Sequence, residues 1–145
     1  YELVTFISKH NPVFSTLQLT QGVLPMSEIP KLNSLTLSIA NSLPMIKRRI
    51  EGQLLPSLGL HPQNISVMEN LEFLTTTIYL DNQFSIMPFS YIANSDFAKI
   101  MLPNHPKIFK LLITPKGHQF TSAERAFMKL AQKEFDQNPY YYYLQ

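Results

Sequence analysis

The side chains that could do chemistry are few, and they are scattered along the sequence. Histidine, the commonest general base and metal ligand, occurs at four isolated positions, His10, His61, His105 and His118. No two of them are spaced to share a metal ion, so we interpret them as surface residues. Glu69 and Glu72 stand near a predicted helix start, where acids favour the helix dipole, and this pair does not indicate acid–base catalysis.

The common catalytic and cofactor motifs are also absent from the sequence. There is no cysteine, which excludes disulfides, thiolate metal sites and a cysteine nucleophile. No nucleophile elbow, Walker loop or dinucleotide-binding glycine pattern occurs, and only four glycines are available to build a phosphate cradle. The sequence therefore predicts a protein that is not an enzyme, with no catalytic residues, no metal site and no cofactor.

One segment does indicate a binding site. The predicted strand 35–39 runs through Ala40, Asn41 and Ser42 directly into a helix whose first turn contains Pro44. The free backbone N–H groups and the dipole at a helix start stabilise a small anion, and ligands of open α/β sheets favour this location. The alternative is ordinary capping, in which Asn41 or Ser42 only satisfies its own helix.

Apolar periodicity predicts alternating strands and helices along the chain. Strands are expected at residues 2–8, 35–39, 65–68, 84–87, 100–102 and 108–113. Helices are expected from the Asn41-Ser42 cap to about Leu55, from an Asn70 cap to about Leu80, and over 122–135 with Ser122 as cap, with small helical turns at 27–28 and 89–93. This alternation predicts an α/β domain with a largely parallel sheet and right-handed crossovers.

Composition limits the possible function classes. The 145 residues fit one compact domain or two small lobes, and a formal net charge of +2 is too small for a nucleic-acid footprint. The only dense basic cluster, 47–49, is interpreted as a solvated helix face. No apolar run approaches the roughly 18 residues of a membrane span, and no signal segment is visible. We expect a cytoplasmic protein, although a mature secreted protein could look the same.

Four stretches, in order and at matching spacing, carry a resemblance to a known family. They are FISKHNPVF, VLPMSEIPKLNSLTLSIANSLPMIKRRIE, GLHPQNISVMENLEFLTTTIYLDNQFSIMPFSYI and KIFKLLITPKGHQFTSAERAFMKLAQKEF. Together they resemble the C-terminal effector-binding domain of LysR-type transcriptional regulators. Met87-Pro88 stands where the family has Leu-Pro, and Asp81-Asn82-Gln83 replaces the family's Gly-x-Gly turn.

The resemblance implies a periplasmic-binding-protein-like α/β fold, here a partial two-lobe effector domain. Residues 1–138 would form this domain, with 9–100 as the second lobe, and 139–145 would be a tail. Residues 1–8 and 101–138 would supply hinge strands and the closing strand and helix of the first lobe. The implied effector-binding residues are Ala40, Asn41, Ser42, Leu43, Met87 and Pro88. Replacing Ser42 by alanine is then expected to weaken effector binding and leave the fold nearly intact.

The same resemblance implies the partners. We expect a small-molecule effector, with an anionic metabolite among the candidates, and a homodimer or tetramer formed through the effector domain. DNA would be contacted only through a winged-helix domain absent from this chain, and no membrane is involved. That domain and the first half of the effector domain have no counterpart here, which we attribute to truncation. The alternatives are a solute-binding lobe of a transport system, marked by a signal segment upstream, and an enzyme on a similar two-lobe fold, which would need an acid, base or metal set.

Overall fold

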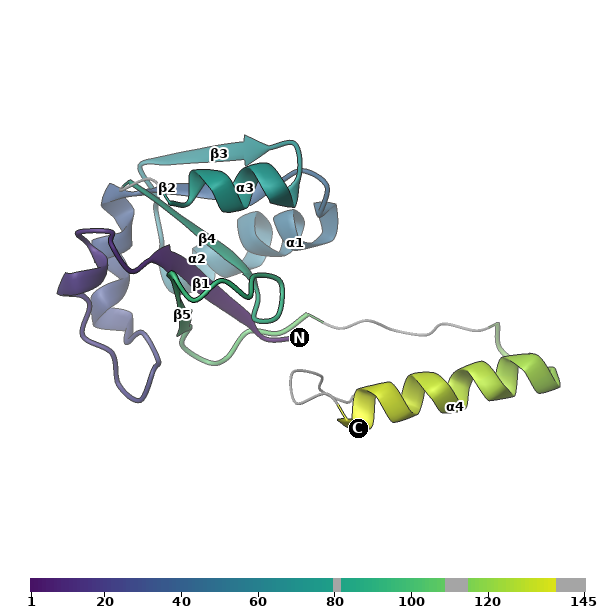
Figure 1. Ribbon diagram of the computed structural model, residues 1–145. Helices are drawn as coiled ribbons and strands as arrows, with labels where there is room; N and C mark the ends of the chain where they lie inside the picture. Colours follow the sequence, from purple (N-terminus) through teal and green to yellow (C-terminus); the bar gives the residue numbers. More distant parts are fainter. Residues whose placement is uncertain (80–81, 109–114, 138–145) are drawn as a thin grey trace.

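A single five-stranded sheet with helices on both faces forms the body of the molecule (Figure 1). The computed structural model describes residues 1–79, 82–108 and 115–137. The strands are β1 (Leu3–Ser8), β2 (Thr36–Ala40), β3 (Asn64–Met68), β4 (Gln83–Pro88) and β5 (Phe97–Met101). The helices are η1 (Phe14–Thr16), η2 (Met26–Ser34), α1 (Pro44–Arg49), η3 (Ile50–Leu54), α2 (Leu55–Leu58), α3 (Leu71–Thr77) and α4 (Ser122–Gln137).

The strand order is β3-β2-β4-β1-β5, and the sheet is mixed. β2 pairs in parallel with β3 and with β4, while β1 is antiparallel to both of its neighbours, β4 and β5. Four strands therefore run in one direction and β1 runs against them. This confirms the predicted α/β class with flanking helices. The reversed strand β1, which lies between β4 and β5, was not predicted.

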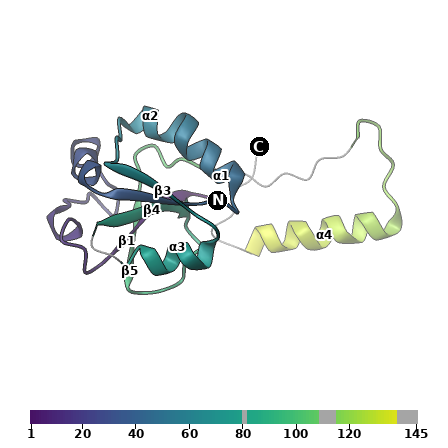
Figure 2. The ribbon, with the colours of Figure 1, turned by 90° about the horizontal axis from the view of Figure 1, so that it is seen from above.

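Side chains alternate between two buried clusters, one on each face of the sheet. Leu3 and Ile7 of β1 belong to the cluster that also contains Ile46 and Ile50 of the α1–α2 segment. Their neighbour Phe6 points to the other face, into a cluster beneath α3. Figure 2 shows α1 and α2 on one side of the sheet and α3 on the other. Because helices cover both faces of the sheet, successive side chains along β1 are buried whichever face they point to.

The helix that follows β2 runs from Pro44 to Leu58 with a π-helical segment in its middle. Pro56 has no N–H to donate, and its ring would clash with the carbonyl four residues earlier in a regular α-helix. The wider π register relieves this conflict, since the Leu55 N–H donates to the Ile50 carbonyl, five residues back. Gly59, with φ of 63°, ends the helix in the left-handed conformation. The predicted helix is confirmed and extends three residues further.

Two helix starts test the predicted caps. Asn70 caps α3 as expected, because its Oδ1 accepts a hydrogen bond from the Phe73 N–H at 3.0 Å. For α4 the expected cap, Ser122, is wrong. Thr121 Oγ1 accepts from the Glu124 N–H at 3.1 Å, and Glu124 Oε1 accepts from the Thr121 N–H at 3.3 Å. This reciprocal pair is a capping box shifted by one residue.

The capping box gives α4 a pH dependence. His118 Nε2 lies 2.7 Å from Glu124 Oε2, and this contact, followed by the hydrogen bonds from Thr121, lowers the pKa of Glu124. A lowered pKa in the folded state stabilises the helix start above the carboxyl's unfolded pKa, and that stability is lost as pH falls through the folded pKa. Carboxyl NMR titration should find the Glu124 midpoint below its value in urea, and His118→Ala should raise it. Equal midpoints in the folded and denatured chain would contradict this.

Several expectations for the remaining segments need correction. The single helical turn at 27–28 is a longer 3-10 helix, η2, and 89–93 forms a turn rather than a helix. The strand expected at 100–102 starts earlier, at Phe97. All of the strand expected at 108–113 except its first residue lies outside the described residues, as does the tail 139–145.

Helix α4 presents apolar side chains to solvent. Phe127 and Leu130 are 59% and 67% exposed. Figures 1 and 2 both show α4 standing apart from the sheet. Within the described ranges, no helix has the length and apolar content needed to cross a membrane.

Candidate functional site

The predicted binding loop lies at the sheet edge where β2 ends. Ala40 is buried, whereas Asn41 and Ser42 are exposed. The Asn41 N–H donates to the Met68 carbonyl at 2.7 Å, and the Leu43 N–H donates to the Ala40 carbonyl at 3.2 Å. Two of the amides expected to face a ligand are therefore already used within the fold.

Neither polar side chain of the loop caps the following helix. The residue at the cap position is Leu43, which offers no side-chain hydrogen bond, and Pro44 follows at the first helical position. The alternative of ordinary capping by Asn41 or Ser42 is therefore wrong. Their side chains remain available for a ligand.

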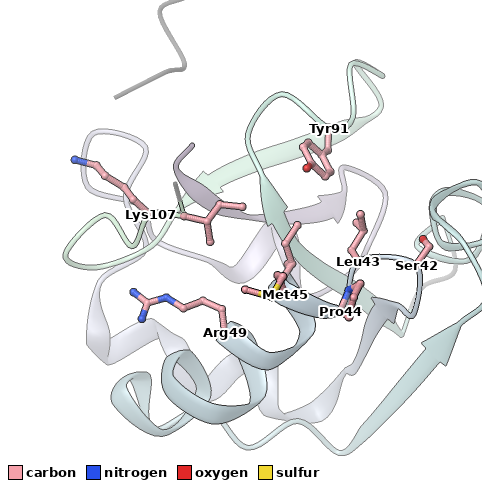
Figure 3. Close-up of a pocket in the computed structure, with 9 residues that line it drawn as sticks. Ser42, Leu43, Pro44, Met45, Arg49, Tyr91 and Lys107 are labelled. Atoms are coloured by element: carbon pink, nitrogen blue, oxygen red, sulfur yellow. The ribbon is translucent and has the colours of Figure 1, made fainter. Parts of the chain in front are cut away.

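An open cavity of about 620 Å³ adjoins this loop (Figure 3). Its volume lies within the range of about 300–1,000 Å³ typical of small-molecule sites. Apolar side chains predominate among the lining residues that the structure describes, and the charged side chains among them are two cations. The lining residues are Ser42, Leu43, Pro44, Met45, Ile46, Arg49, Tyr91, Lys107 and Ile108.

One wall of the cavity is formed by one face of the helix that begins at Pro44. Met45, Ile46 and Arg49 are spaced so that they share one helix face, and Ser42 precedes Met45 by three residues. The opposite wall comes from distant segments, with Tyr91 after β4 and Lys107 and Ile108 after β5. The sequence prediction found Ser42 and Leu43 but missed the other seven. The helical spacing from Ser42 could have found Arg49, whereas no local signal marks Tyr91 or Lys107.

The structure separates Met87 and Pro88 from this cavity. Met87 is 2% exposed and packs with Leu74 and Ile78 in the cluster beneath α3. Pro88 is also buried and stands opposite Leu3 in the pairing of β4 with β1. Neither residue belongs to the described cavity lining. Ala40 and Met87 belong to the same buried cluster, and Leu43 packs against it. The structure therefore brings the loop 40–43 and the end of β4 together in the core, outside the described lining of this cavity.

The two arginines of the basic cluster differ in their surroundings. Arg48 is exposed, as expected for a solvated face, but Arg49 is half-buried and lines the cavity. Lys47 Nζ lies 3.4 Å from Glu51 Oε2, whereas Arg49 forms no ion pair with any residue that the structure describes. The guanidinium of Arg49 is therefore a charged group available to a ligand.

The chain enters and leaves the sheet beside the cavity. The Leu3 N–H donates to the Pro106 carbonyl, and the Ile108 N–H donates to the Tyr1 carbonyl, both at 2.8 Å. Residues 1–3 and 106–108 therefore form an antiparallel pair, named here the edge pair. Glu2 Oε1 also lies 2.7 Å from Nδ1 of His105, the residue just before the second segment. Because Lys107 and Ile108 belong to the edge pair, movement of this pair would reshape the cavity.

In comparisons with known proteins, no family model and no curated protein matches the chain. The similarity to LysR-type effector domains therefore stays a prediction from the sequence. Among the described residues, no group of three or more histidine, aspartate or glutamate side chains could hold a metal ion.

Proposed function

We propose that residues 1–108 are one lobe of a two-lobed module that binds a small molecule beside its hinge. We further propose that this module is the effector-sensing part of a LysR-type transcription regulator. The observation that carries the first proposal is the position of the cavity next to the edge pair. The second proposal rests on this cavity together with the resemblance of the sequence to LysR-type effector domains.

The sheet topology supports a hinge at this edge. β1 and β5 are antiparallel neighbours, so β1 begins and β5 ends at the same edge of the sheet. The chain enters and leaves through two adjacent extended segments, and two such segments can absorb a rotation through a few backbone torsions. The cavity lies between the edge pair and the start of α1, where a second lobe could contact a bound ligand.

The mechanism follows from unequal affinity for two lobe arrangements. A ligand that contacts both lobes favours the closed arrangement by the difference in its binding free energies. Such coupling is typically about 1–3 kcal/mol. The closing movement would pass through paired effector domains to the DNA-binding heads. The lining residues suit binding rather than catalysis, since the nine include no carboxylate and no imidazole.

Amide shift mapping by NMR tests the binding site. Small apolar carboxylates and amides, added one at a time to the full chain, should cause saturable shifts at Met45, Ile46 and Ile108. Met45→Ala should weaken binding several-fold, because Met45 lines the cavity. Met26→Ala is the matched control, since Met26 is also exposed but lies on η2, away from the cavity lining. Saturable shifts only outside the cavity, or none, would overturn the proposal.

A further inference from the structure

We infer that the ligand of this cavity is a monocarboxylate with an apolar body. Its carboxylate lies at the end formed by Arg49 and Lys107, and its apolar part lies against Leu43, Met45 and Tyr91. This inference rests on the proposed function and names the ligand class of the same site. It places the charge at the opposite end from the Asn41-Ser42 loop that the family resemblance implies.

Charge is concentrated at one end of the cavity. Arg49 comes from the helix and Lys107 from the edge pair, so each of two walls contributes one cation to the lining. In Figure 3 both side chains extend to the same end, while Ser42 lies at the other. The nine described lining residues include no acidic side chain, and Arg49 forms no ion pair with any residue that the structure describes. A carboxylate placed there would form charge-assisted hydrogen bonds, and a guanidinium can hold it with two parallel bonds.

The rest of the cavity is suited to an apolar group. Leu43, Pro44, Met45, Ile46 and Ile108 offer aliphatic surface. Leu43 and Tyr91 also pack against the buried clusters on both faces of the sheet, which fixes this part of the wall. A uniformly polar ligand such as a sugar would make no apolar contact with this aliphatic surface. An apolar chain would cover the surface and exclude water from it.

The loop end is the weaker place for the charge. The amides of Asn41 and Leu43 already donate to carbonyls of the fold, and Ser42 adds only a neutral hydroxyl to the lining. Ser42 lies in the turn before the helix, and Figure 3 shows it at the opposite end of the cavity from the Arg49 guanidinium. The two ends are therefore distinct, and a single carboxylate cannot contact both.

Titration calorimetry of the full chain with octanoate and with its neutral counterpart octanamide tests this orientation. Octanoate should bind about ten-fold more tightly than octanamide, because a hydrogen bond to a charged group is stronger than a neutral one. Arg49→Gln should remove most of this difference and leave octanamide binding nearly unchanged. Arg48→Gln is the matched control, since it makes the same charge change at an exposed position, and it should alter octanoate binding less than two-fold.

The outcomes separate this inference from the proposed function. If octanamide binds as tightly as octanoate, with shifts at Met45 and Ile108, the cavity is a binding site but the ligand class is wrong. If Ser42→Ala weakens octanoate binding more than Arg49→Gln does, the carboxylate lies at the loop end and the inferred orientation is overturned. If neither compound nor any other small apolar molecule binds in the cavity, the proposed function fails as well.

Discussion

Replacing Phe84 by alanine is expected to lower the free energy of unfolding by about 3–5 kcal/mol. Phe84 is fully buried in β4, the central strand of the sheet. It stands opposite Ile7 on β1 and Leu37 on β2, so its ring fills space between three strands. The loss combines the transfer free energy of the ring with the cavity left behind. Since domains of this size are stable by only about 5–15 kcal/mol, much of the fold's stability would be lost.

Urea unfolding followed by circular dichroism measures this change. Phe73→Ala is the matched control, because Phe73 lies on α3 and is 60% exposed. The control should cost less than about 1 kcal/mol, as is usual for surface positions. Equal losses for the two variants would mean that the sheet does not bury Phe84 between its neighbours.

Leu3→Ala is expected to cost about 2–5 kcal/mol and, in addition, to weaken ligand binding. Leu3 is fully buried, and its N–H donates to the Pro106 carbonyl within the edge pair. Without this side chain, Leu3 holds residues 106–108 less firmly, and this segment places Lys107 and Ile108 in the cavity wall. Unfolding in urea measures the first effect, and calorimetry with octanoate under native conditions measures the second.

The control for this variant is a second leucine from the same cluster. Leu24 is equally buried, but it pairs with Met101 and does not belong to the edge pair or to the cavity lining. Leu24→Ala should therefore destabilise the fold to a similar extent and leave octanoate binding unchanged in the fraction that stays folded. If both variants lost binding equally, the edge pair would have no particular role in shaping the cavity.

Local features of the fold were predictable from the sequence, whereas strand direction was not. The alternation in β2 and the Asn70 cap of α3 depend on residues a few positions apart, so the sequence carries them directly. The reversal of β1 depends on its pairing with β4 and β5, which lie at least 75 positions later in the chain. The continuation of the helix through Pro56 depends on a π segment that ordinary proline rules do not anticipate.

The residues of the candidate site likewise fall into those that local sequence predicts and those that only the tertiary fold brings together. Ser42 and Leu43 were found because a helix start directly after a strand is a local signal. Tyr91 and Lys107 were missed because tertiary folding alone brings them beside the helix. Met87 was expected to line the cleft but lies in the core. A strand covered on both faces is apolar at successive positions, so the sequence does not say which of its side chains reaches an open cavity.

A crystal structure of the full chain grown with octanoate tests the central claim most directly. The expected result is ligand density in the cavity between Tyr91 and Arg49, in contact with Ile108 of the edge pair. The opposite result is a chain whose cavity is closed by its own side chains, Met45 or Tyr91, with octanoate bound elsewhere or absent. That result would remove the binding site on which the proposed sensor function depends.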